Sequence, residues 1–196
     1  TVVARSGGKE LFAPAHVHNF YYRLDFDIDG AANDGVEEFN YKQEEPNRSL
    51  AFRNSWTPLP KETTRSLDSG AFRSWRVVDK LSVNTLGHRR SYELMPGGNG
   101  LFRGAASEPV AQADLWINRY RRSEFPLTLG EPRPVKGAMA GWVNGESVDG
   151  ADVVLWYSMH VHHLPRTEDY PAMPVVWEGF TLMPRDFLDE SPLKSE

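Results

Sequence analysis

The chain has 196 residues, of which 40% are hydrophobic and 12% aromatic, enough for one domain with a packed core. Its net charge is −5 and its Lys and Arg residues are scattered, so we expect neither nucleic-acid binding nor a basic membrane-binding face. It contains no cysteine, so any metal must take histidine and carboxylate ligands, and no stretch resembles a signal peptide or a membrane span. Lack of cysteine is compatible with the cytosol, and we expect a cytoplasmic protein.

The first element, "APAHVHNFYYRLDFDIDG" at residues 13–30, alternates strictly between apolar and polar positions. Period two over this length predicts a β-strand, because successive side chains point to opposite faces. His16 and His18 stand at the leading end of the apolar, buried face. The opposite face carries three carboxylates, at Asp25, Asp27 and Asp29. Like charges so close together favour water or a cation.

Strand-like patterns dominate the rest of the chain. Residues 30–35 are predicted to form a turn, with 36–43 returning as the second strand of a hairpin. Residues 107–125 fit either a short helix or a strand, and the Gly- and Pro-rich segment 126–150 is expected to be a surface excursion. Further strands are predicted at 72–79, within 84–100, at 151–165 and at 175–184. The chain is therefore expected to be all-β, a sandwich, with residues 1–196 forming one domain.

The second long strand repeats the pattern of the first. His163 ends its more uniformly apolar face, whereas His160 and His162 share the opposite parity. Each long strand thus brings imidazole to the end of a buried face, and three neutral imidazoles with an open position suit Cu(II) or Zn(II). Structural histidines bonded to backbone carbonyls are the commoner case, and His160 and His162 are interpreted as a surface pair or a weak second metal site. A cupin site is disfavoured, because no glutamate follows His18 at the expected spacing.

Four blocks of the chain match one family pattern in order and spacing. "LFAPAHVHNFYYRLDFDIDG" is similar to Y-A-P-x-H-Q-H-x-F-x-x-R-L-D-x-D-I-D-G, and "LGHRRSYEL" to G-x-x-R-S-Y. "ADVVLWYSMHVHHLPRTEDYPAMPV" is similar to D-x-V-x-W-x-T-x-G-x-x-H-x-P-R-x-E-D-W-P-x-M-P-V, and "EGFTLMPRDFLDESP" to G-F-x-L-x-P-x-x-F-F-D-x-N-P. The chain thus resembles the C-terminal part of the catalytic domain of copper amine oxidases, the topaquinone enzymes. It departs from the family at "SMHVHH" and at Tyr170, which replaces a tryptophan.

The resemblance implies two metal sites and a nearby methionine. Copper(II) would be bound by His16, His18 and His163, with Met173 close to it unless that residue is an ordinary core methionine. A peripheral site of the calcium type would hold Ca²⁺ or Mn²⁺, which prefer oxygen ligands, although a solvated acidic face is the alternative. Its ligands would be the carboxylates of Asp25, Asp27 and Asp152 with the backbone carbonyls of Phe26 and Val153.

Part of the family's machinery has no counterpart in the chain. The family makes topaquinone from a tyrosine in an N-Y-D/E motif that precedes the H-x-H pair, and its catalytic base lies further upstream. The one Asn-Tyr pair here, Asn40-Tyr41, follows the histidines and precedes Lys42, so we interpret Tyr41 as structural. A larger partner subunit is therefore expected to carry quinone and base and to complete the incomplete domain within a hetero-oligomer. Together they would oxidise a primary amine to aldehyde, ammonia and hydrogen peroxide, while this chain alone would be inactive.

Two other hypotheses remain open. The chain could be a non-catalytic, copper-holding structural subunit of an amine-oxidase-like assembly. It could also be a stand-alone metalloenzyme with three histidine ligands, unrelated to amine oxidation.

Overall fold

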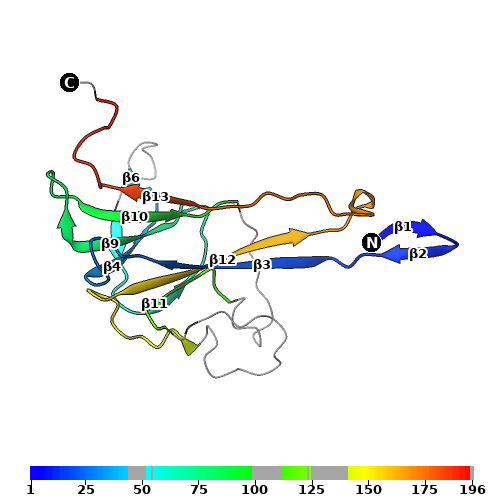
Figure 1. Ribbon diagram of the computed structural model, residues 1–196, viewed down its shortest axis with the longest axis horizontal. Coiled ribbons are helices and arrows are strands. Elements are labelled where there is room, and N and C mark those ends of the chain that lie inside the picture. The colour runs from blue at the N-terminus through cyan, green and yellow to red at the C-terminus, as the bar shows by residue number, and fades with distance from the viewer. Residues whose placement is uncertain (44–51, 54, 99–111, 123, 125–140, 195–196) are drawn as a thin grey trace.

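The computed structural model of the chain describes residues 1–43, 52–53, 55–98, 112–122, 124 and 141–194 (Figure 1). Within this part the fold is all-β, which confirms the predicted class, and a 3₁₀ helix, η3, spans Thr167–Asp169. No helix in the described part is long and apolar enough to cross a membrane.

The described strands follow one another along the whole chain. In order they are β1 (Val2–Ser6), β2 (Lys9–Phe12), β3 (His16–Asp25), β4 (Asp34–Phe39), β5 (Lys42–Gln43), β6 (Phe52–Arg53), β7 (Trp56–Pro58), β8 (Thr63–Arg65), β9 (Ser74–Val83), β10 (Arg89–Met95), β11 (Leu115–Arg119), β12 (Val153–His163) and β13 (Thr181–Arg185).

Two antiparallel sheets build the body of the protein. One has five strands in the order β13-β10-β9-β4-β7, and the other has four in the order β3-β12-β11-β8. The main hydrophobic core takes Trp75 and Leu94 from the first sheet and Leu155 and Tyr157 from the second, all fully buried. Each such side chain stabilises the fold by roughly 1.5–3 kcal/mol through loss of apolar surface to water. The two sheets therefore pack as a sandwich around this core.

The predicted hairpin between the first long strand and residues 36–43 is wrong. β3 pairs with β12 in the four-stranded sheet, whereas β4 pairs with β7 and β9 in the other sheet. Phe26 and Ile28, directly after β3, are buried in the core between the sheets. The chain therefore crosses from one layer to the other over residues 26–33, and Asp29 and Asn33 adopt positive φ there (60° and 76°). The turn exists, but it joins two layers instead of two paired strands.

β12 is covered on both of its faces. Val153, Leu155 and Tyr157 point into the main core. Val154 and Trp156 point the other way, into a second cluster built with Trp116 and Trp142. The alternation of β12 thus separates two buried environments, and neither face meets water until the strand reaches His162.

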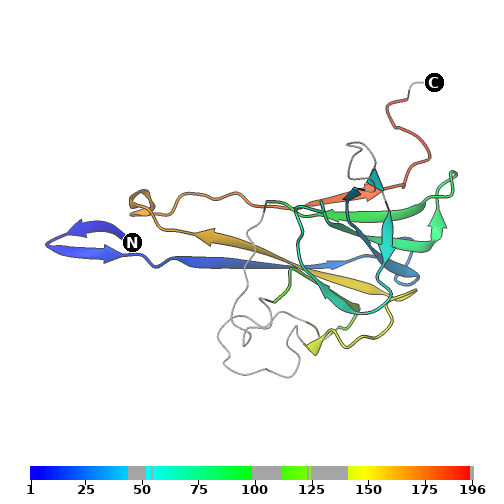
Figure 2. The ribbon, with the colours of Figure 1, turned by 180° about the vertical axis from the view of Figure 1, so that it is seen from behind.

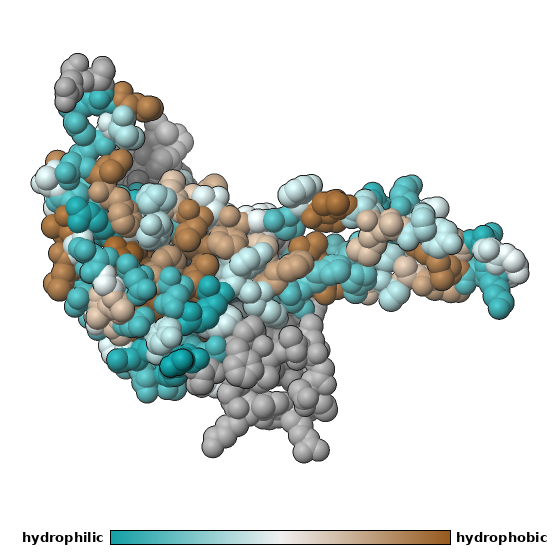
Figure 3. Space-filling view, in the orientation of Figure 1, coloured by the Kyte–Doolittle hydropathy of each residue, from teal (hydrophilic) through white to brown (hydrophobic). Residues whose placement is uncertain are grey.

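Beyond the body of the sandwich, β3 and β12 continue side by side as a projecting arm, which ends in the β1–β2 hairpin (Figures 1 and 2). Apolar side chains lie on the surface of this arm (Figure 3). Phe20 and Tyr22, on the predicted buried face of β3, are 46% and 38% exposed. The apolar face of β3 is therefore buried only where the five-stranded sheet covers it.

The structure also tests the predictions for residues 107–125 and 175–184. The described residues of the former form strand β11, which resolves the choice between helix and strand. The predicted last strand is shorter than expected, because only Thr181–Arg185 pairs, with β10. The preceding Val175, Val176 and Trp177 are exposed and outside any strand. Residues 126–140, most of the predicted surface excursion, lie outside the described residues.

Candidate metal centre

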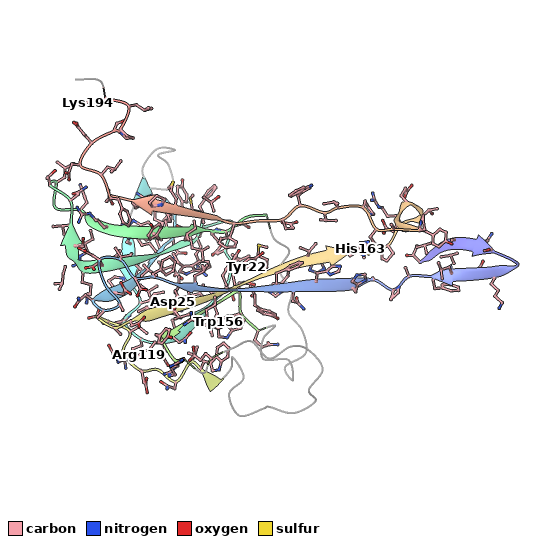
Figure 4. The ribbon with its side chains drawn as sticks, viewed as in Figure 1. Tyr22, Asp25, Arg119, Trp156, His163 and Lys194 are labelled. Atoms are coloured by element: carbon pink, nitrogen blue, oxygen red, sulfur yellow. The ribbon has the colours of Figure 1, made fainter. Side chains whose placement is uncertain are left out.

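His16 and His163 face each other across the β3–β12 ladder. Facing residues of an antiparallel pair project from the same face, and residues two apart on one strand share a face, so His18 projects beside them. Figure 4 shows His163 at the end of β12 that lies away from Asp25. The ladder thus gathers the three histidines that parity selected, from positions 147 residues apart in the chain.

Three ring nitrogens converge at this point. His16 Nε2 lies 3.0 Å from His18 Nε2 and 3.3 Å from His163 Nδ1. Metal–imidazole bonds of about 2.0–2.1 Å, at angles between square and tetrahedral, place two ligand nitrogens about 2.9–3.3 Å apart. Among the described residues, these three form the one group of His, Asp or Glu side chains that could hold a metal ion, with one ligand atom from each within 4.8 Å of the others. The trio therefore has the spacing of a ligand set.

The outer nitrogens of two of these rings are held by acceptors. His16 Nδ1 lies 3.0 Å from the backbone oxygen of Pro14, and His163 Nε2 lies 2.7 Å from Asp169 Oδ2. With its proton on the outer nitrogen, each neutral ring donates there and turns a lone pair toward the centre. The backbone amide of Arg166, together with His163, holds the pKa of Asp169 below its usual range, so this acceptor stays ionised.

The arrangement of the ring nitrogens suits coordination of a metal ion better than direct contact between the rings. A neutral His16 that donates from Nδ1 and a neutral His163 that donates from Nε2 have no proton for the contact between His16 Nε2 and His163 Nδ1, and facing lone pairs repel. Three neutral imidazoles are a donor set that suits Cu(II) or Zn(II). His16 is exposed while the other two are half-buried, so one side of the centre stays open for further ligands.

A groove of about 320 Å³ runs beside the centre. His18 and His163 line it together with Met173, which the resemblance places near copper. Met173 is 48% exposed, so it is not an ordinary core methionine in this chain. The other lining residues are mainly apolar and include Phe20, Tyr22 and Val176. The groove thus joins the metal centre to the exposed apolar face of the arm.

The predicted peripheral site lies at the other end of β3. Asp25 pairs with Arg23 at 2.7 Å, and Asp152 Oδ1 is buried without a hydrogen-bond partner. Burial raises the pKa of Asp152, and the charges of Asp25 and Asp27 raise it further. These carboxylates influence one another but do not converge as the histidines do. Phe26 is buried in the core and Val153 begins β12, so their backbones flank the same carboxylates.

Asp34 joins this acidic region and was not among the predicted site residues. It faces Asp79 across the β4–β9 ladder, is fully buried, and has no hydrogen-bond partner on either carboxylate oxygen. Burial and the charges of Asp79, Asp152 and Asp27 raise its pKa to about 8, against a smaller opposite effect of the Val153 amide. In the sequence Asp34 is an ordinary turn aspartate, and only the packing of the two layers buries it.

The surface interpretation of the His160 and His162 pair is wrong for His160. His162 is exposed, but His160 is fully buried on the face of β12 opposite the metal centre. Its Nδ1 lies 2.7 Å from Asn19 Oδ1 and its Nε2 lies 3.2 Å from Ser158 Oγ. Tyr41, interpreted as structural, packs edge-on against Phe72 with ring centroids 5.7 Å apart, in keeping with that interpretation.

The chain is similar in sequence to known proteins over most of its length. Residues 6–195 match the family model described as copper amine oxidase, enzyme domain. The chain is 35% identical over 202 aligned positions to the peroxisomal copper-containing diamine oxidase 1 of Nicotiana tabacum, covering 93% of this chain and 26% of that protein. It is also 35% identical over 198 positions to the histamine oxidase of Arthrobacter globiformis, covering 93% and 29%.

A solved structure shows the same fold. The copper-containing benzylamine oxidase from Hansenula polymorpha superposes with a TM-score of 0.80 at 23% identity, covering 93% of this chain and 31% of that one. The chain spans about a quarter to a third of the length of these relatives. The family match extends over nearly every residue, and the chain belongs to the copper amine oxidase family.

Proposed function

We propose that this chain is the copper-binding small subunit of a two-chain copper/topaquinone amine oxidase, which converts a primary amine to aldehyde, ammonia and hydrogen peroxide. The observation that carries the proposal is the convergence of three ring nitrogens, from His16, His18 and His163, with outer nitrogens held at Pro14 O and Asp169. Copper(II) bound there would supply the redox chemistry that forms the quinone and assists reaction with dioxygen.

The chain's own residues prepare this centre. Pro14 O and Asp169 fix the tautomers of His16 and His163, so that the lone pairs point inward before a metal arrives. The rigid ladder of β3 and β12 sets the spacing between the rings. Met173 lies in the groove beside two of them and would limit access of water to that side of the ion.

The exposed apolar face of the arm supports a partner subunit. Trp177 is 88% exposed, Val175 76% and Val176 57%, and they continue the surface on which Phe20 and Tyr22 lie open. Clustered exposure of large apolar side chains is typical of surfaces that another protein covers. We propose that the larger subunit covers this face and brings its topaquinone and catalytic base to the copper, within a higher-order hetero-oligomer.

The proposed class of substrate rests on the names of the similar proteins. Those named above are a diamine oxidase, a histamine oxidase and a benzylamine oxidase, which share an amine substrate. We propose a primary amine as the substrate of the assembly. The peripheral carboxylates are proposed to hold Ca²⁺ or Mn²⁺, because an unpartnered buried oxygen such as Asp152 Oδ1 suits a hard cation.

Metal analysis and phenylhydrazine labelling of the complete purified protein test the proposal. We expect one copper per copy of this chain, an electron paramagnetic resonance (EPR) spectrum of Cu(II) with nitrogen ligands, and a labelled quinone on the partner polypeptide. Copper without any quinone would instead support the non-catalytic, copper-holding subunit. A folded, monodisperse single chain that binds metal without a partner would support the stand-alone metalloenzyme.

A further inference from the structure

The two strands of the metal centre carry more histidines than the centre uses. β3 begins with His16-Val17-His18, and β12 ends with His160-Val161-His162-His163. In the observed alignment His163 faces His16. If β3 moved by one residue along β12, His16 would face His162 and His18 would face His160. Such a slip turns a whole strand over, so His16 and His18 would lie on the opposite face of the sheet, away from His163.

The apolar pattern of β12 discriminates poorly between these alignments. Every residue from Val153 to Val161 is buried, because the main core covers one face and the Trp116–Trp142 cluster covers the other. On β3, which pairs with β12, the side chains of Phe20 and Tyr22 are exposed to solvent. β12 alone does not set the register, because both of its faces are buried, whereas the apolar and polar faces of β3 favour the observed alignment. A polar contact between the two strands adds to this selection.

The cross-strand pair of Asn19 and His160 is such a contact. The two residues face each other in the ladder, and His160 Nδ1 lies 2.7 Å from Asn19 Oδ1. His160 Nε2 is engaged by Ser158 Oγ at 3.2 Å, with Asp114 Oδ1 at 3.6 Å. His160 and Ser158 are both 0% exposed. A slip of β3 would remove the acceptor of a buried imidazole, and a buried donor left without a partner is destabilising.

We propose that Asn19 and His160 form a register lock, a part-buried cross-strand pair that adds to the alternation of β3 in selecting the β3–β12 alignment in which His163 joins His16 and His18. The lock is a positioning pair and not a second metal site. The ring of His160 and the amide of Asn19 lie on the face opposite the trio, and both nitrogens of His160 already have partners. Single buried polar groups specify register in the same way in coiled coils. The inference rests on the proposed copper role of the trio.

Copper affinity of the complete protein tests the lock. Asn19→Leu keeps the branched shape of the asparagine side chain and removes the acceptor. It is expected to weaken copper binding about tenfold, measured by competition with a chelator, and to change the nitrogen hyperfine pattern in the EPR spectrum of the copper that remains. The reciprocal exchange, Asn19→His with His160→Asn, retains a cross-strand hydrogen bond and is expected to restore both readouts.

His162→Ala is the matched control, because His162 is an exposed histidine on the same strand. It is expected to leave copper affinity and spectrum unchanged. Unchanged copper binding in Asn19→Leu, an equal loss in His162→Ala, or failure of the exchanged pair to fold or to recover copper would each overturn the lock. A wild-type protein that binds no copper would instead refute the proposed function, so the two failures are distinct.

Discussion

The carboxylate of Asp169 accepts a hydrogen bond from the ring of His163, with 2.7 Å between Asp169 Oδ2 and His163 Nε2. Asp169 lies in η3, the short 3₁₀ helix that follows β12, and its side chain is 3% exposed. The backbone amide of Arg166 donates to the same oxygen at 2.9 Å. The helix after the strand thus orients a ring at the end of the strand, six residues earlier in the chain.

Asp169→Asn tests this orientation. The Arg166 amide would hold the asparagine carbonyl at the same place, but a neutral oxygen is a weaker acceptor than the carboxylate, so the proton of His163 is held less firmly on Nε2. We expect copper affinity to fall about 10- to 100-fold, the range found when such partners of metal ligands are removed. Chelator competition on the complete protein measures the change. Glu168→Gln is the matched control, because it is a neighbouring exposed residue, and a similar loss there would contradict the role of Asp169.

The candidate centre was largely predictable from the sequence, because strand parity depends only on spacing. The shared face of His16 and His18 follows from alternation alone, and His163 was distinguished from its neighbours by its apolar parity. The pairing of β3 with β12 was not predictable in this way. Both strands alternate between apolar and polar residues, and this local pattern does not identify the strand with which each one pairs.

The errors have a common physical cause, which is that alternation reports two faces but not what covers them. His160 was interpreted as exposed because it shares the parity of His162, yet a second hydrophobic cluster covers that face of β12. The hairpin was predicted because a turn joins two alternating segments, yet Phe26 and Ile28 lead the chain into the other layer. Asp169 lies within a recognised motif, but its partner becomes evident only when η3 folds back against His163.

Asp34→Asn is expected to change how stability depends on pH. The pKa of Asp34 is raised from 3.8 to about 8, so between these values the folded chain holds a proton that the unfolded chain releases. This contribution to stability is complete below pH 4 and declines as pH rises toward 8, by up to about 1.4 kcal/mol per pH unit. Asparagine keeps the neutral shape and does not titrate. The variant should therefore be the more stable protein near pH 8.

Denaturant unfolding in calcium-free buffer between pH 5 and 8 measures this difference. Asp29→Asn is the control, because Asp29 is exposed and asparagine also tolerates its positive φ of 60°. The interpretation fails if Asp34→Asn and the wild type have parallel stability profiles over this range.

Asp152→Asn tests the proposed peripheral cation. Ca²⁺ is expected to raise the thermal midpoint of the wild type, because a ligand that binds only the folded state stabilises it. The variant lacks a charged oxygen at that place and should respond much less. Because burial raises the pKa of Asp152, protons compete with the cation, and the calcium effect on the wild type should shrink as pH falls. An equal calcium response in Asp152→Asn would exclude this residue as a ligand.

Trp177→Glu tests the apolar surface proposed to meet the larger subunit. Trp177 is 88% exposed, so the substitution removes little packing within this chain, and its stability should change by no more than about 0.5 kcal/mol. A charge buried against an apolar partner surface is costly, so the yield of assembled protein after co-expression should fall at least tenfold.

Size-exclusion chromatography of the co-purified chains measures the assembly, and circular dichroism checks the fold. Leu193→Glu, at a residue 92% exposed and outside the groove, is the control and should assemble normally. If Trp177→Glu assembles as well as this control, the partner does not cover residues 175–177.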